Sequence, residues 1–146
     1  MKKRKSKKVM VFGVFDLFHP GHKFFLKEAS QRGDFLVVVV ARDENVKNRK
    51  GSLPVDKEDL RREKVERWLK KTAISGKVIL GKNDFSQRHL LLKEEKPDII
   101  CLGYDQEIDQ KDLLFWDSCD ILKNPVVERI KPYKPEIYKS SKVKKR

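Results

Sequence analysis

The sequence predicts an α/β protein built on a parallel β-sheet, and two observations carry this prediction. Two strongly apolar stretches, residues 9–15 and 35–41, flank a segment with the apolar spacing of a helix, as in a right-handed βαβ unit. The second stretch is apolar throughout and does not alternate, which indicates a strand buried on both faces. A length of 146 residues suits one such domain with one hydrophobic core. We expect this domain to span residues 9–146.

The first helix is predicted to begin at Pro20, because proline is suited to a first helical position. Gly33 follows its expected end, as glycine often does. Helical spacing places Phe25, Leu26 and Ala29 on the face that packs against the sheet.

The remaining elements follow in chain order. Residues 45–54 are polar and basic, and predict a flexible loop. A helix is expected from Val55 and Asp56 onward, with Asp56 as its N-cap. Its predicted buried stripe consists of Leu60, Val65, Trp68 and Leu69. Further on, the pattern predicts a strand at 77–80, a helix at 86–95 before Pro97, a strand at 99–102, a helix at 109–123 and a last strand at 125–130.

Positive charge is concentrated at the two ends of the chain. The net charge is +13, but the first eight residues carry six positive charges and residues 139–146 carry five, which leaves +2 for the body. We therefore expect residues 1–8 to form a solvated basic arm, and nucleic acid is not the expected partner. No apolar stretch is long enough to cross a bilayer, so no membrane association is expected. Cys101 and Cys119 lack metal-binding spacing, which favours a reducing cytoplasm.

Two histidines mark the candidate site. His19 and His22 lie three residues apart at the expected start of a helix, so they share a face near free amide groups and the positive end of the helix dipole. Gly13 would let a phosphate approach the backbone where the strand ends. The pattern predicts an anion site with two titratable donors. A metal site or two polar loop residues are alternatives, although zinc is disfavoured because Asp16 is the only acidic candidate nearby.

These residues carry a family resemblance. Residues 13–22 (Gly-Val-Phe-Asp-Leu-Phe-His-Pro-Gly-His) resemble the signature of the cytidylyltransferase-like nucleotidyltransferases, whose His-x-Gly-His motif matches without a gap. Within this family the chain is most similar to archaeal-type FAD synthases, because residues 38–43 resemble their Val-Val-Val-Ala-Arg-Asp and residues 102–106 their Leu-Gly-Tyr-Asp-Gln. The resemblance implies one Rossmann-like domain with five parallel strands in the order 3-2-1-4-5, helices on both faces, and a homodimer.

The resemblance also implies a catalytic set. His19 and His22 are expected to donate hydrogen bonds to oxygens that bridge the reacting phosphates. Lys50 and Lys142 are expected to offset charge on the departing pyrophosphate. Relatives have Lys-x-Lys-Gly where this chain has residues 48–51 (Asn-Arg-Lys-Gly). The place of the first lysine holds Asn48, so Lys47 or Arg49 is expected to replace it. A substrate-contacting arginine of the family corresponds to Arg61 or Arg62.

The rest of the expected site binds the nucleotide. The resemblance suggests that Tyr104 stacks on the base and that Asp105 binds ribose or metal-bound phosphate. Ser140, Ser141 and Lys142 match a Ser/Thr-rich segment whose amides hold the triphosphate in relatives, so residues 139–146 are expected to form a phosphate-binding tail. The full expected binding set is Phe12, Gly13, Val14, Phe15, Asp16, Gly21, Lys47, Arg49, Gly103, Tyr104, Asp105, Ser140, Ser141 and Lys142.

The reaction implied is nucleotidyl transfer. A phosphate of the acceptor attacks the α-phosphorus of a nucleoside triphosphate and pyrophosphate leaves, with Mg²⁺ held mainly by the triphosphate. No protein ligand of the metal is assigned. The turn at residues 103–106 favours ATP with FMN as acceptor, and CTP with glycerol 3-phosphate is the alternative. A non-catalytic nucleotide or nucleic-acid binder is a third possibility, suggested by Asn48 and the basic ends.

Overall fold

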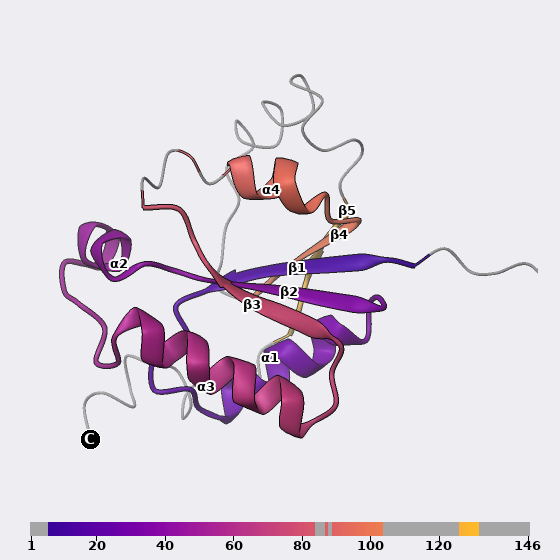
Figure 1. Ribbon diagram of the computed structural model, residues 1–146, viewed down its shortest axis with the longest axis horizontal. Coiled ribbons are helices and arrows are strands. Elements are labelled where there is room, and N and C mark those ends of the chain that lie inside the picture. Colours follow the sequence, from indigo (N-terminus) through magenta and orange to yellow (C-terminus); the bar gives the residue numbers. More distant parts are fainter. Residues whose placement is uncertain (1–5, 84–86, 88, 104–125, 132–146) are drawn as a thin grey trace, which may run out of the picture.

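The arrangement of helices and strands comes from a computed structural model that describes residues 6–83, 87, 89–103 and 126–131 (Figure 1). The elements in chain order are β1 (Lys8–Gly13), α1 (Pro20–Ser30), β2 (Phe35–Val40), α2 (Asp43–Lys50), α3 (Glu58–Lys71), β3 (Gly76–Leu80), α4 (His89–Glu95), β4 (Ile99–Leu102) and β5 (Val126–Arg129).

The five strands form one parallel sheet in the order β3-β2-β1-β4-β5, which confirms the predicted fold class and strand order. Strand β1 lies at the centre, where Val11 pairs with Val38 of β2 and with Cys101 of β4. Because the strands are parallel, their carboxyl ends meet at one edge of the sheet. The loop that precedes α1, the helix α2 and Gly103 all follow strands at this edge.

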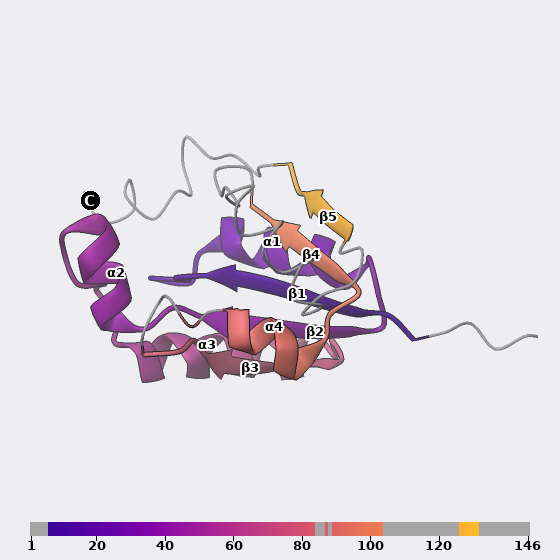
Figure 2. The ribbon, with the colours of Figure 1, turned by 90° about the horizontal axis from the view of Figure 1, so that it is seen from above.

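Helices cover both faces of the sheet (Figures 1 and 2). Helices α1 and α3 lie on one face, where Leu26 and Val65 pack with Val38 in a single apolar cluster. Helix α4 covers the other face, where Leu92 packs with Met10. Helix α2 covers neither face and lies beyond the carboxyl end of β2 (Figure 1). It is therefore placed beside the loops that emerge from the sheet.

The prediction of a flexible loop at residues 45–54 is wrong, because α2 extends to Lys50. This helix buries only Asn45 and Val46, so it has no apolar periodicity to reveal it. Its signals are at its ends: acidic residues in the first turn, basic residues in the last, and Gly51 in the left-handed conformation with φ of 84°. The predicted loop contracts to the segment between α2 and α3.

The predicted start of the next helix also needs correction. Helix α3 begins at Glu58 with Lys57 as N-cap, so Asp56 is not the capping residue. The Asp56 carboxylate instead pairs with Lys64, at 2.7 Å. Leu60, expected in the buried stripe, is 39% exposed, whereas Arg61 next to it is fully buried. The hydrophobicity of the residue types favoured Leu60, but the polar partners of Arg61 decide which side chain points inward.

Strand β1 begins one residue earlier than predicted and ends at Gly13 instead of Phe15. Phe15 has φ of 55°, which is incompatible with a strand. The predicted strands at 77–80, 99–102 and 125–130 correspond to β3, β4 and β5. Helix α4 occupies most of the stretch predicted as 86–95, and the helix predicted at 109–123 lies outside the described residues. Among the helices that the structure describes, none has the length and apolar character needed to cross a membrane.

Close contact between β2 and β3 yields a test of the sheet. A Cβ atom added to Gly76 would collide with the carbonyl oxygen of Leu36, whereas one added to Gly81 would meet ordinary neighbours at 3.6 Å. We expect Gly76→Ala to lower the free energy of unfolding by about 1–3 kcal/mol, as overpacking does. Gly81→Ala is the control and should change it much less. Urea unfolding followed by circular dichroism measures both, and equal effects would contradict the register of β2 and β3.

Candidate active site

The loop between β1 and α1 has an unusual backbone. Phe15 and Leu17 both have left-handed φ values, 55° and 59°. Such values in residues other than glycine are costly and are concentrated at functional sites. A Cβ atom at Gly13 would lie 2.7 Å from the Phe15 ring. The absence of a side chain at Gly13 therefore makes room for this ring, a role that the sequence prediction of phosphate approach did not include.

The two histidines cap the helix that follows. His19 is the N-cap of α1, and its Nδ1 accepts a hydrogen bond from the backbone N–H of Gly21, at 3.2 Å. His22 completes the reciprocal pair, because its Nδ1 accepts from the backbone N–H of His19, at 3.3 Å. The imidazole rings stack with their centroids 3.7 Å apart. The sequence placed both side chains at the start of the helix, and the structure adds that each ring is fixed by a capping bond.

These capping bonds determine which ring nitrogen carries the proton. A neutral imidazole has one donor nitrogen and one acceptor nitrogen. Since Nδ1 accepts in His19 and in His22, Nε2 carries the hydrogen in both neutral rings. The pair therefore presents two Nε2–H donors, which suit the oxygens of a phosphate.

Burial keeps the histidine pair neutral. Burial is the largest cause that lowers the pKa of His22 to about 3; the neighbouring His19 and Lys50 act in the same direction, and Asp16 opposes them. The Phe15 ring lies edge-on to the His22 ring with 5.5 Å between the ring centroids. The Phe18 ring stacks on the His22 ring with 6.1 Å between the centroids. Burial also lowers the pKa of His19. At neutral pH both rings are hydrogen-bond donors without a positive charge.

Helix α2 brings cationic side chains to the same edge of the sheet. Lys47, Arg49 and Lys50 lie in its last turn and are exposed. After burial and His19, the Lys50 ammonium is one of the charges that lower the pKa of His22. Asn45 anchors the helix, because its amide donates to the carbonyl oxygen of Lys82, at 2.9 Å.

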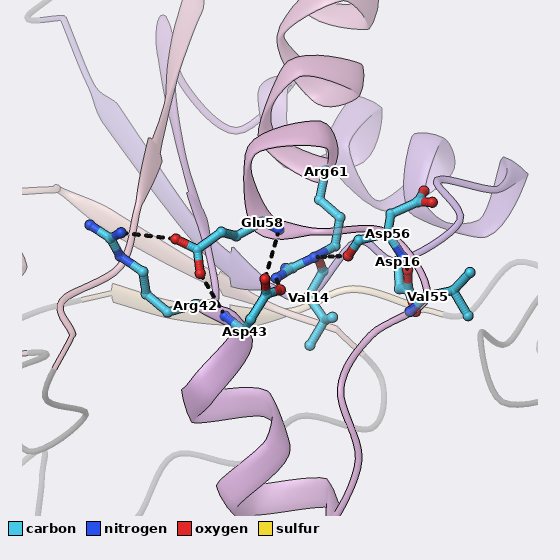
Figure 3. Close-up of polar contacts among 8 residues, drawn as sticks. All are labelled: Val14, Asp16, Arg42, Asp43, Val55, Asp56, Glu58 and Arg61. Carbon is cyan, nitrogen blue, oxygen red and sulfur yellow. Dashed lines mark hydrogen bonds and ion pairs between the residues drawn. The ribbon is translucent and has the colours of Figure 1, made fainter.

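Carboxylates hold the surrounding segments together (Figure 3). The two oxygens of Asp16, which is 1% exposed, accept from the backbone N–H groups of Val55 and Asp56, at 2.8 and 2.9 Å. The side chains of Asp43 and Glu58 each accept from the backbone N–H of the other residue, at 3.3 and 2.9 Å. Asp16 therefore fixes the loop before α3, and the helices α2 and α3 cap each other.

Arg42 adds a further link to this network. It donates to Glu58 at 2.9 Å and to the carbonyl oxygen of Gly81 at 2.8 Å (Figure 3 shows the first of these bonds). The sequence prediction did not assign Arg42, Asp43 or Glu58 to the site. The one available signal was that residues 38–43 resemble a family motif.

The other predicted residues are placed as follows. Val14 precedes the histidine pair in sequence and Gly21 lies between the two histidines. Both use backbone groups: the Val14 carbonyl accepts from Arg61, and the Gly21 N–H donates to His19. Phe12 packs partly into the apolar cluster beneath α4. Gly103 follows β4, beside β1, and its carbonyl accepts from Arg129 at 2.9 Å. The predicted residues outside the described part of the chain are Tyr104, Asp105, Ser140, Ser141 and Lys142.

Comparison with known proteins identifies the family. The profile described as cytidylyltransferase-like matches residues 10–146. The chain belongs to the cytidylyltransferase-like family. The enzyme class predicted from its His-x-Gly-His motif, a nucleotidyltransferase, is confirmed.

Individual proteins similar to this cytidylyltransferase-like chain were also found. A protein of Aciduliprofundum boonei named FAD synthase is 46% identical over 106 residues, which cover 73% of this chain and 66% of that protein. A FAD synthase of Pyrococcus abyssi is 39% identical over 140 residues, which cover 95% of this chain and 90% of the other. A crystal structure from Thermoplasma volcanium, titled lipopolysaccharide core biosynthesis protein, is 36% identical with a TM-score of 0.73 and covers 89% of this chain and 100% of its own.

The neutral histidine pair has a consequence for stability. Because the folded-state pKa of His22 is lowered to about 3, the folded chain binds fewer protons than the unfolded chain between that value and about pH 6.5. The free energy of unfolding should therefore fall as the pH decreases through this range. We expect His22→Gln to lose less stability than the wild type between pH 7 and pH 5.

Urea unfolding at the two pH values measures this difference. His89→Gln is the control, since His89 lies on α4 at the other face of the sheet and its replacement leaves the pair intact. This control should keep the steeper dependence of the wild type. The same slope in wild type and His22→Gln would show that burial does not hold the ring neutral.

Proposed function

We propose that this protein is an FMN adenylyltransferase, which joins AMP from ATP to FMN and releases pyrophosphate. The observation that carries the chemistry is the reciprocally capped histidine pair, whose two Nε2–H donors lie at a helix N-terminus. Relatives named FAD synthase, at 46% and 39% identity, support the choice of substrates. The sequence of residues 103–106 supports it as well, because it resembles that of these enzymes.

In this reaction an oxygen of the FMN phosphate forms a bond to the α-phosphorus of ATP. The bond between the α-phosphorus and the oxygen that bridges to the β-phosphorus breaks, and its electron pair leaves with pyrophosphate. Negative charge develops on the phosphoryl oxygens, where donors fixed in advance are most effective. His19 and His22 would donate from Nε2 to these oxygens. The amide groups of the α1 N-terminus would add the positive end of the helix dipole.

Lys50 is proposed to offset the charge of the departing pyrophosphate. Lys50 lies at the C-terminal end of α2, and besides burial its charge is one of the causes that lower the pKa of His22, which supports this role. Lys47 or Arg49 would contact the outer phosphates in place of the lysine that Asn48 replaces. Ser140, Ser141 and Lys142 belong to the proposed triphosphate site on the strength of the family resemblance.

Mg²⁺ is proposed to arrive with the triphosphate. Among the described residues, no three His, Cys, Asp or Glu side chains gather into a potential metal site. The donor set near the histidines therefore suits a metal carried by phosphate oxygens and water, which is how Mg²⁺ usually binds in such enzymes. The proposal further includes a homodimer, from the family resemblance, and a cytoplasmic location, which suits the free and buried thiol of Cys101.

The choice of substrates is tested by product analysis. The purified chain is incubated with Mg²⁺, one nucleotide (ATP or CTP) and one acceptor (FMN or glycerol 3-phosphate), and the products are separated by chromatography. We expect flavin adenine dinucleotide and pyrophosphate from ATP with FMN. Product only from CTP with glycerol 3-phosphate would favour the alternative enzyme. Binding of nucleotide without turnover in any mixture would favour a non-catalytic binder.

The histidine mechanism is tested by variants that separate capping from catalysis. His19→Asn keeps a side chain that caps a helix well but removes the Nε2–H donor. We expect it to retain nearly the thermal stability of the wild type and to lower turnover by about 10²-fold or more. His22→Ala should lower turnover similarly, and His89→Ala should leave it unchanged. Turnover near that of the wild type in His19→Asn would remove His19 from the chemistry.

A further inference from the structure

Arg61 is an arginine without solvent exposure, and it joins three separate segments of the chain. Its Nε donates to the carbonyl oxygen of Asp56, at 3.0 Å. Its Nη1 donates to the carbonyl oxygen of Val14, at 2.8 Å, and its Nη2 pairs with the carboxylate of Asp43, at 2.6 Å (Figure 3). Every nitrogen of the guanidinium is therefore bound by the protein itself.

The segments that Arg61 joins carry the reacting groups of the proposed site. Val14 opens the loop that leads from β1 to the histidine pair. Asp43 is the first residue of α2, whose last turn carries Lys50. Asp56 lies in the loop before α3, which Asp16 also holds through two backbone amides. One guanidinium is thus the common neighbour of the histidine loop and of the helix that carries the lysine.

Direct contact with substrate does not fit this geometry. A phosphate that approached the Arg61 guanidinium would have to displace Val14, Asp43 or Asp56, because the side chain has no solvent-exposed surface. A buried charge is stable only while its partners stay in place, so these partners cannot move independently. The bonds to Val14 and Asp43 therefore fix the distance between the two segments.

We propose that Arg61 is a positioning residue for nucleotidyl transfer, which holds the histidine loop and helix α2 in the relative arrangement that the reaction needs. This inference rests on the proposed function. The carboxylate of Asp43 is the acidic partner in this role. The same carboxylate also accepts from the backbone N–H of Glu58. It therefore links α2 to α3 at two places, the first residue of α3 and the side chain of Arg61.

The first test compares Arg61→Lys, Arg61→Met and Asp43→Asn with the control Arg67→Met. Arg67 lies on the same helix but is largely exposed and pairs with Glu63 of that helix. Lysine keeps the positive charge of Arg61, but it cannot replace a planar guanidinium that donates hydrogen bonds to three acceptors. We expect Arg61→Lys to lower kcat and raise KM for MgATP, with kcat/KM reduced tenfold or more at a temperature where the variant is folded.

The control should stay within about twofold of the wild type, as surface substitutions usually do. If Arg61→Lys lowers only the melting temperature and keeps the wild-type kcat and KM, Arg61 is merely structural and the proposal fails. If Arg61→Met does not fold, the kinetics of Arg61→Lys and Asp43→Asn still test the positioning role, since each of these variants retains most of the original side chain.

A double variant tests whether Arg61 acts through α2. The reductions in kcat/KM caused by Lys50→Met and Arg61→Lys should not multiply. If Arg61→Lys displaces α2, Lys50 no longer contributes to the reaction, so its removal has little further effect. Losses that multiply fully would show that Arg61 acts independently of Lys50, against the proposal.

Isothermal titration with MgATP provides a readout that does not need FMN turnover. Arg61→Lys should bind MgATP about tenfold more weakly than Arg67→Met, and equal affinities would overturn the positioning role. If the wild-type chain makes no dinucleotide from ATP and FMN, the proposed function fails while this binding comparison still decides the role of Arg61.

Discussion

The carboxyl edge of this sheet depends on one buried charge, the guanidinium of Arg61. A charge without solvent must keep its hydrogen-bond partners, and here the partners belong to the end of β1, the start of α2 and the loop before α3. Apolar packing cannot replace this constraint, since α2 buries only Asn45 and Val46. The helix that carries Lys50 is therefore placed by electrostatics and hydrogen bonds more than by the hydrophobic core.

In the histidine pair, helix capping determines which ring nitrogen of each imidazole carries the proton. Each Nδ1 satisfies a backbone N–H at the start of α1, which leaves the proton on Nε2 in both neutral rings. The stacked arrangement and the burial by Phe15 and Phe18 disfavour a second proton. The interactions that begin the helix thus also orient the donors and keep them uncharged.

The strained turn after β1 connects these two features. Left-handed φ values at Phe15 and Leu17 turn the chain sharply, and the Phe15 ring folds back over Gly13 and against His22. Asp16, the residue between them, turns inward to the loop before α3. A regular strand continuation would have directed these side chains to alternate faces of the sheet. The strain therefore allows two adjacent residues, Phe15 and Asp16, to serve the core and the loop before α3.

The sequence by itself determined the sheet, the first helix and the histidine pair, because their signals are local: apolar runs, Pro20 at a helix start, and two histidines three residues apart. It did not determine α2, whose stability comes from its end charges and its contacts with Lys82 and Glu58. Nor did it determine the roles of Asp43 and Arg61, which meet across 18 positions, or of Arg61 and Val14, across 47. Only the tertiary structure decided these, because a charge pair needs proximity in space, and spacing along the chain does not reveal which carboxylate a buried arginine will face.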